Sequence, residues 1–304
     1  MIDANLTQVF IRLLYHEIPK FQFESAWCLT NIASGSSDHV SSLIEKDVVT
    51  HFLHLLSSPH LEVVEQVIWG LGNIAGDCPM TRDCVLKSGA LVKIANVLDN
   101  AQSGTPFMRN CSWALSNLCR GKPTPDFDLV KRAIPSLTKV ITENDSEEII
   151  TDISWALSYL SDGAKDGIEY FLNEALLKKL IKLLQHQTVS VVIPCLRTIG
   201  NILTGDDNQT QFVVNCGLVG GLHAIIDHPK RTVRKEACWV LSNITAGTEV
   251  QIQECIDVGI VDKLVHILSH DEMPVKNEAV WALSNTTAGA TPEQFYALVN
   301  KGII

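Results

Sequence analysis

Residues 68–77 read IWGLGNIAGD and contain a tryptophan and an asparagine four positions apart, Trp69 and Asn73. Tryptophan occurs at 27, 69, 113, 155, 239 and 281, so that successive gaps are 42, 44, 42, 84 and 42 residues. Arg197 stands in the middle of the double gap. Four residues after these seven positions come Asn31, Asn73, Asn117, Tyr159, Asn201, Asn243 and Asn285. The pair therefore marks an internal repeat that runs through the whole chain.

The length of the repeat predicts the fold class. A period of about 40 to 47 residues is typical of helical solenoids of the armadillo and HEAT types. In the third repeat, residues 79–86 and 90–98 predict two short helices separated by Gly89, and 107–119 predict a third helix that ends before Gly121. Three helices per unit favour the armadillo plan, since HEAT units have two. We predict an all-α, right-handed superhelical solenoid of about seven armadillo repeats.

The repeats also predict the domain organisation. A repeat array packs its units on one continuous core, so we expect residues 1–304 to form a single domain. We expect this domain to be truncated at both ends, because the chain opens on a second helix at 6–14 and stops where another should begin. The expected repeats are about 1–37, 38–79, 80–123, 124–165, 166–207, 208–249 and 250–291, followed by a partial repeat at 292–304.

Composition and charge limit the classes of partner. The chain is 46% hydrophobic and 19% charged, which is typical of a well-buried helical protein. We expect no membrane partner, because no apolar run reaches the roughly 18 residues of a membrane-spanning helix and no signal peptide begins the chain. The net charge of -10 argues against nucleic acid, including RNA readers built from helical repeats, and favours basic ligands.

Enzymatic and metal-binding motifs are weak in this sequence. His51 and His54 lie three residues apart without a third ligand, so we expect no metal site. Gly70, Gly72 and Gly76 have the wrong spacing for a nucleotide-binding loop and follow no predicted strand. We therefore expect no cofactor and no enzymatic activity.

The Trp–Asn pairs predict a peptide-binding surface. Residues four apart share one face of a helix, and in an armadillo array the third helices line the concave surface. An asparagine amide suits the N–H and C=O of an extended peptide, and neighbouring indoles leave slots for Lys or Arg side chains. Acidic residues lie beside the pairs, at Asp77, Asp152, Asp207, Glu236 and Glu278.

Core packing of the tryptophans and capping by the asparagines is the alternative interpretation. However, the pair recurs in helix interiors, where asparagine is a poor helix former, so we attribute the amides to a shared ligand backbone.

With this motif the chain resembles the importin-α (karyopherin-α) family of armadillo adaptors, which carry nuclear localisation signals. The resemblance rests on SAWCLTNIASG at 25–35, on Glu65 and Gln66 followed by the segment to Asp77, and on KNEAVW at 276–281. Tyr159 and Arg197 depart from the internal repeat, and in this they resemble the family's fourth and fifth repeats. The resemblance implies a nuclear import adaptor that shuttles between cytoplasm and nucleus, with nuclear localisation signal peptides of cargo proteins as partners.

The resemblance also implies two sites for Lys/Arg-rich signals. The family's major site, in repeats 1–4, corresponds to Trp27, Asn31, Gly35, Gln66, Trp69, Asn73, Asp77, Asn110, Trp113, Asn117, Asp152 and Trp155. Asp77 would hold the key lysine. The minor site, in repeats 5–7, corresponds to Arg197, Asn201, Asp207, Glu236, Trp239, Asn243, Glu278, Trp281 and Asn285. Arg197 replaces an indole and would repel cations, which fits the linker of a two-cluster signal.

The chain departs from the family in three respects. Val40 stands where the family often has a threonine, so a hydroxyl acceptor for the key lysine is missing. The basic importin-β-binding segment is absent, since the first 60 residues contain only Arg12, Lys20 and Lys46 as Lys or Arg. The repeats that contact the export receptor are also missing. We therefore expect importin-β and the export receptor as partners only of the full-length protein, and we expect this fragment to bind cargo without autoinhibition.

A second armadillo function remains open. Scaffolds of the β-catenin type bind other extended peptides, including acidic ones, in the same groove. A basic groove would favour that function, whereas the positions mapped here are mainly acidic.

Overall fold

The computed structural model describes residues 6–102, 104–163 and 165–300, and these residues form α-helices and short 3-10 helices without a β-strand. Two compact units divide the chain, Met1–Leu160 and Ser161–Ile304, called here the first and second unit. None of the described helices is both long and apolar enough to cross a membrane. The predicted all-α armadillo fold is confirmed, while its right-handed superhelical course and the single domain stay predictions.

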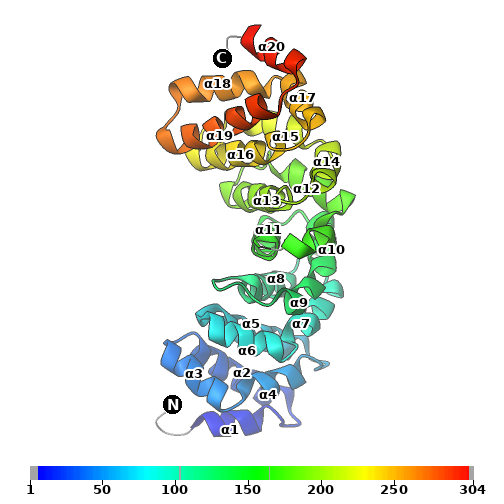
Figure 1. Cartoon of the computed structure of the whole chain (residues 1–304). Helices are drawn as coiled ribbons and strands as arrows, with labels where there is room; N and C mark the ends of the chain where they lie inside the picture. The colour runs from blue at the N-terminus through cyan, green and yellow to red at the C-terminus, as the bar shows by residue number, and fades with distance from the viewer. Residues whose placement is uncertain (1–5, 103, 164, 301–304) are drawn as a thin grey trace. The chain divides into compact units, whose positions relative to one another are not determined.

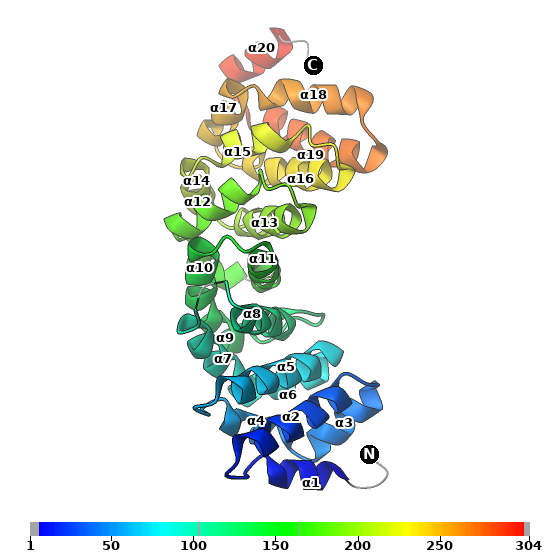
Figure 2. The ribbon, with the colours of Figure 1, turned by 180° about the vertical axis from the view of Figure 1, so that it is seen from behind.

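Helices of the first unit follow in the order first, second and third helix of each repeat (Figure 1). They are α1 (Leu6–Leu13), α2 (Pro19–Ala33), α3 (Ser37–Glu45), α4 (Val48–Leu55), α5 (Leu61–Asp77), α6 (Pro79–Lys87), α7 (Ala90–Asp99), α8 (Pro106–Cys119), α9 (Phe127–Val130), η1 (Lys131–Ala133), α10 (Ile134–Glu143) and α11 (Glu147–Ser161). The third helices α2, α5 and α8 pack on one another in succession, as both views of the unit show (Figure 2).

The second unit repeats this plan. Its helices are η2 (Lys165–Phe171), α12 (Glu174–Leu183), α13 (Val189–Ile202), α14 (Asp207–Asn215), α15 (Leu218–Ile225), α16 (Arg231–Thr245), α17 (Glu249–Asp257), α18 (Ile260–His270), α19 (Met273–Gly289) and α20 (Pro292–Asn300). Here α13, α16 and α19 are the third helices, and each packs on the next. All the predicted Trp and Asn positions of this unit lie on these three helices.

The turn between first and second helix requires a left-handed residue in most repeats. Gly89, Gly217 and Gly259 have φ values of 82°, 92° and 81°, which glycine adopts without a steric cost. Asp47 takes the same place with φ 54°, and its side chain accepts a hydrogen bond from Thr50. The turn predicted at Gly89 is confirmed, and glycine marks the same turn in two further repeats.

Polar bonds between neighbouring repeats occur in all three helix layers. In the second-helix layer, lysine ammonium groups donate to carbonyl oxygens in the last turn of the preceding second helix, where unpaired carbonyls and the helix dipole favour a cation. These bonds join Lys93 to Leu53, Lys139 to Asp99 and Lys263 to His223 at 3.2, 3.0 and 3.0 Å. In the first-helix layer, Gln251 donates to the Asp207 carbonyl at 3.0 Å and Gln294 to that of Glu249 at 2.9 Å.

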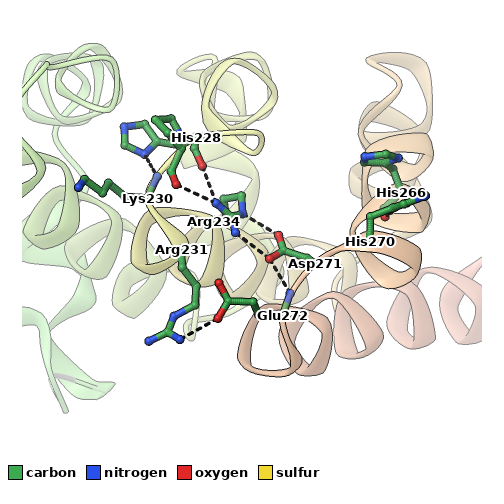
Figure 3. Close-up of polar contacts among 9 residues, drawn as sticks. His228, Lys230, Arg231, Arg234, His266, His270, Asp271 and Glu272 are labelled. Atoms are coloured by element: carbon green, nitrogen blue, oxygen red, sulfur yellow. Dashed lines mark hydrogen bonds and ion pairs between the residues drawn. The ribbon is translucent and has the colours of Figure 1, made fainter.

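A half-buried ion pair connects two linkers of the second unit (Figure 3). Arg234, in the first turn of α16, donates from Nε and Nη2 to both carboxylate oxygens of Asp271 at 2.6 and 2.7 Å. Its Nη1 donates to the carbonyl oxygens of His228 and Pro229 at 2.9 and 3.1 Å. The Asp271 side chain is 8% exposed. The linker before α19 is therefore fixed to the linker before α16.

Candidate peptide-binding surfaces

The tryptophans of the first unit reach solvent from consecutive third helices. Trp27 is 47% exposed and Trp69 46% exposed, whereas Trp113 and Trp155 are half-buried. The Trp155 ring lies near that of Tyr159, with centroids 5.6 Å apart and planes at 28°. Indoles at these exposures are available to a ligand, which is not expected of core residues.

The asparagines do more than the sequence analysis supposed. In four of them Nδ2 donates to the carbonyl oxygen of the residue just before the Asn position of the preceding repeat. The bonds join Asn73 to Thr30 (3.3 Å), Asn117 to Gly72 (3.2 Å), Asn243 to Gly200 (3.0 Å) and Asn285 to Ser242 (2.9 Å). The argument that only a ligand would require these amides is therefore wrong. One N–H of each amide holds the array together, and the amide's second N–H and its oxygen are the groups suited to a ligand.

Asp77 ends α5 at the surface of the first unit. Its Oδ1 accepts a hydrogen bond of 2.7 Å from the Ser37 hydroxyl, in the first turn of α3. Ser37 was not predicted as a neighbour of Asp77 from the sequence, which pointed to position 40 instead. Val40, however, is a buried core residue. The neighbouring polar group that orients this carboxylate is thus a serine three residues earlier on the same helix.

Asp152 lies half-buried on α11 among other charged groups. The pKa of Asp152 is raised to about 6, mainly by burial and secondly by the nearby negative charge of Glu148. The positive charge of Arg109 acts in the opposite direction and lowers this pKa. The Arg109 guanidinium donates to Glu148 at 2.6 Å. Beside it, Asn110 Nδ2 donates to the Glu65 carboxylate at 2.7 Å. The carboxylates of Glu65, Glu148 and Asp152 therefore lie around the Arg109 guanidinium.

The predicted residues of the first unit are not all on its surface. Gln66 and Asn117 are buried, and Gln66 Nε2 has no hydrogen-bond partner among the described residues. The other ten are exposed or half-buried: Trp27, Asn31, Gly35, Trp69, Asn73, Asp77, Asn110, Trp113, Asp152 and Trp155.

Carboxylates of the second unit have cationic partners within the chain. Arg197, which stands where a tryptophan would be expected, approaches Glu236 with Nη2 3.2 Å from Oε1. Lys235 lies 3.9 Å from Glu278. Asp207 is exposed at the start of α14, a first helix, so it stands apart from the third-helix row.

All the predicted residues of the second unit reach solvent. Arg197, Asp207 and Trp281 are exposed, and Trp281 has an exposure of 64%. The half-buried ones are Asn201, Glu236, Trp239, Asn243, Glu278 and Asn285. Asn201 departs from the carbonyl pattern, since its Nδ2 donates to the Ser161 hydroxyl at 3.0 Å.

Known proteins resemble this chain both in the single repeat and over longer stretches of sequence. The Armadillo/beta-catenin-like repeat family matches residues 1–34, 36–76, 206–246 and 248–288. Importin subunit alpha-1b of Oryza sativa subsp. japonica is 48% identical over 207 residues, which are 68% of this chain and 38% of the relative. Importin subunit alpha-B of Dictyostelium discoideum is 45% identical over 208 residues, 68% of this chain and 40% of the relative. The chain belongs to the importin-α family of armadillo-repeat proteins.

Solved structures agree with the armadillo fold of this importin-α chain. The crystal structure of an engineered protein gives a TM-score of 0.86 at 25% identity and covers 97% of the chain and 71% of that protein. A designed armadillo repeat protein in complex with peptide (KR)4 gives a TM-score of 0.53 at 24% identity, with 92% of this chain and 99% of that one covered. Membership of the importin-α family agrees with the prediction that the chain is not an enzyme. The matches span about two fifths of the length of the curated relatives.

Proposed function

We propose that this chain is the cargo-binding part of a nuclear import adaptor, which shuttles between cytoplasm and nucleus and holds Lys/Arg-rich nuclear localisation signals in extended conformation. The observation that carries the proposal is that solvent-reaching indoles lie on successive third helices of the first unit, which also carry Asp77 and Asp152, with Asp77 oriented by Ser37. The names of the importin relatives support the same function. Importin-β and an export receptor are proposed as partners of a longer protein only.

Affinity on such a surface requires several repeats to act together. A cation–π contact contributes about 0.5–2 kcal/mol and a hydrogen bond about 1 kcal/mol. Micromolar binding needs about 8 kcal/mol, so one indole slot with one amide is too weak. We propose that the ten solvent-reaching residues of the first unit form the major site and that Gln66 and Asn117 support it from beneath.

We propose that the second unit carries the minor site. Its carboxylates Glu236 and Glu278 are already near Arg197 and Lys235, and a cationic peptide has to displace these partners. Asp77 instead accepts its hydrogen bond from a neutral hydroxyl, and no ion pair to it is found among the described residues. The charge of Asp77 is therefore better available to a ligand.

The proposed function is tested by calorimetric titration of the chain with a lysine-run peptide and with its alanine-substituted control, at two salt concentrations. We expect binding of the lysine peptide only, and weaker binding at the higher salt, because salt screens exposed charges. Binding of an acidic peptide in preference to the lysine peptide would instead indicate a scaffold of the β-catenin type. The absence of binding to any basic peptide would reject the proposal.

Peptide affinity should fall when the pH is lowered from 7.5 to 5.5. Because the pKa of Asp152 is raised to about 6, its carboxylate is mostly ionised at pH 7.5 and loses its charge as the pH falls through that value. Lysine and arginine of the peptide stay charged throughout. The measurement is calorimetric affinity at both pH values for wild type and Asp152→Asn, and the variant should lose part of the pH dependence.

The thermal stability of Asp152→Asn serves as the control. A folded-state pKa above the ordinary 3.8 means that ionised Asp152 destabilises the fold, and this penalty grows as the pH rises from about 4 to 6. The variant should therefore be no less stable than wild type at pH 7.5. An equal pH dependence of affinity in both proteins would exclude Asp152 as its source.

Removing Lys235 should strengthen binding to the second unit. The Lys235→Ala variant frees Glu278 from its partner, and an exposed ion pair contributes about 0.2–1 kcal/mol, which corresponds to about 1.5- to 5-fold in affinity at low salt. The titration uses an Asp77→Lys background, so that the first unit does not contribute. Lys178→Ala is the matched control, because Lys178 pairs with Glu174 on α12 and should leave the affinity unchanged. Equal affinities for Lys235→Ala and its background would contradict the prediction.

A further inference from the structure

Gly72 lies in mid-helix on α5, immediately before Asn73. A Cβ at this position would overlap Cζ3 of Trp113, a contact that real Cβ atoms do not make, and would lie 3.0 Å from its Cε3, which is a tight contact. The six-membered ring of the next repeat's indole therefore rests where a side chain would be. The carbonyl oxygen of the same glycine accepts the bond from Asn117. One glycine thus receives both members of the following Trp–Asn pair.

Gly200 repeats this arrangement in the second unit. It precedes Asn201 on α13, and a Cβ there would overlap Cζ3 of Trp239 and lie 2.6 and 2.8 Å from its Cη2 and Cε3. Its carbonyl oxygen accepts the bond from Asn243. The same contact occurs in both units, although glycine in a helix interior is destabilising relative to alanine.

Repeats without this glycine differ among themselves in how far the next tryptophan is exposed. Thr30 holds the corresponding position before Trp69, which is 46% exposed, although a third helix lies on either side of it. Trp113, which follows Gly72 and also has a third helix before it, is half-buried. Trp155, which follows Ser116, is half-buried as well, so the overlap with the glycine, and not exposure alone, distinguishes Trp113 and Trp239.

We propose that Gly72 and Gly200 are positioning residues for peptide recognition. Each forms a socket, defined by the space above its Cα, that fixes the benzo edge of Trp113 or Trp239 and holds the indole in one pose before a ligand arrives. This role rests on the proposed function, because the ligand is a Lys/Arg-rich peptide whose cationic side chains lie against the fixed rings. Thr30 lacks such a socket, so Trp69 is free to adapt to different side chains.

Fixing an indole in advance removes part of the cost of ordering it on binding. That cost is about 0.5–1.5 kcal/mol for an immobilised side chain, equivalent to about 2- to 12-fold in affinity. Gly72→Ala places a Cβ in the socket and forces the Trp113 ring outward. The Asn117 bond survives, because its acceptor is the main-chain carbonyl of residue 72. The variant should therefore bind peptide about 2- to 12-fold more weakly.

The experiment combines acrylamide quenching of tryptophan fluorescence with calorimetric titration of an alternating Lys-Arg octapeptide. Gly72→Ala should show increased quenching and the weaker affinity. Gly72→Ala combined with Trp113→Phe, compared with Trp113→Phe alone, should show no increase in quenching, which assigns the change to Trp113. Ser116→Ala is the matched control, because Ser116 precedes Asn117 and already carries a Cβ, and it should leave both measurements unchanged.

Unchanged quenching in Gly72→Ala would overturn the socket, and increased quenching with wild-type affinity would overturn its role in recognition. If wild type fails to bind the octapeptide, the proposed function fails, while the quenching comparison still decides whether the socket exists. If Gly72→Ala does not fold, the same two measurements are made in the second unit on Gly200→Ala, with Trp239→Phe in place of Trp113→Phe. These measurements then test the proposal by the same criteria.

Discussion

Asp77→Lys should abolish binding of a lysine-rich peptide to the first unit while leaving the helix content unchanged. Opposite unit charges about 4 Å apart near a protein surface attract by about 4 kcal/mol before further solvent screening, and a lysine makes that interaction repulsive. We expect the affinity to fall about 100-fold or more, since each 1.4 kcal/mol is about 10-fold. Calorimetric titration measures the affinity, and far-UV circular dichroism measures the helix content.

Two smaller changes at the same place act as controls. Asp77→Asn removes the charge without repulsion and should weaken binding less than Asp77→Lys. Ser37→Ala removes the hydroxyl that donates to Asp77 and should weaken peptide binding by about 0.5–1.5 kcal/mol, the net range of a single hydrogen bond. An Asp77→Lys chain that binds a single-cluster lysine peptide as wild type does would show that the key carboxylate lies elsewhere.

Arg234→Met should lower the stability of the second unit by about 1.5–3 kcal/mol, because it removes the hydrogen bonds of a guanidinium to a largely covered carboxylate. The pH dependence should also change. The pKa of Asp271 is lowered, mainly by the hydrogen bonds that Arg234 donates. The pair therefore stabilises wild type at pH values above the ordinary pKa of 3.8, and this contribution is lost as the pH falls through the lowered pKa. The measurement is urea unfolding at pH 7, with a second series towards pH 3.

In the variant, acid should instead relieve the penalty, because protonation neutralises an unpaired buried carboxylate. Arg231→Met is the matched control: Arg231 pairs with Glu272 on the same linkers, but both side chains are more than half exposed (Figure 3). Its loss should change stability by less than about 1 kcal/mol. Equal unfolding midpoints for the Arg234 and Arg231 variants would show that the Arg234–Asp271 pair stabilises the fold no more than the exposed pair does.

The sequence predicts the helix order well, because period and turn signals are local. Glycine at 89, 217 and 259 and the repeated tryptophan locate the turns and the third helices directly. The exposure of Trp27 and Trp69 also follows from their repetition on one helix face. These features depend on residues within one repeat.

Features that depend on two repeats are missed. Asn117 and Gly72 are 45 positions apart, and nothing in either helix alone indicates that one donates to the other. Ser37 and Asp77 are 40 positions apart, so the sequence alone does not indicate that Ser37, rather than residue 40, donates to this carboxylate. The burial of Gln66 likewise follows from packing against neighbouring helices. Such contacts need the register of two packed repeats, which periodicity alone does not supply.

The lysine, glutamine and asparagine bonds to main-chain oxygen described above share a direction: the donor belongs to the later repeat and the carbonyl to the earlier one. Every residue type offers that oxygen, so these bonds do not depend on the side chains of the repeat before. Whole repeats can thus be duplicated, exchanged or lost during evolution, provided that each inserted repeat contains its own donor side chains.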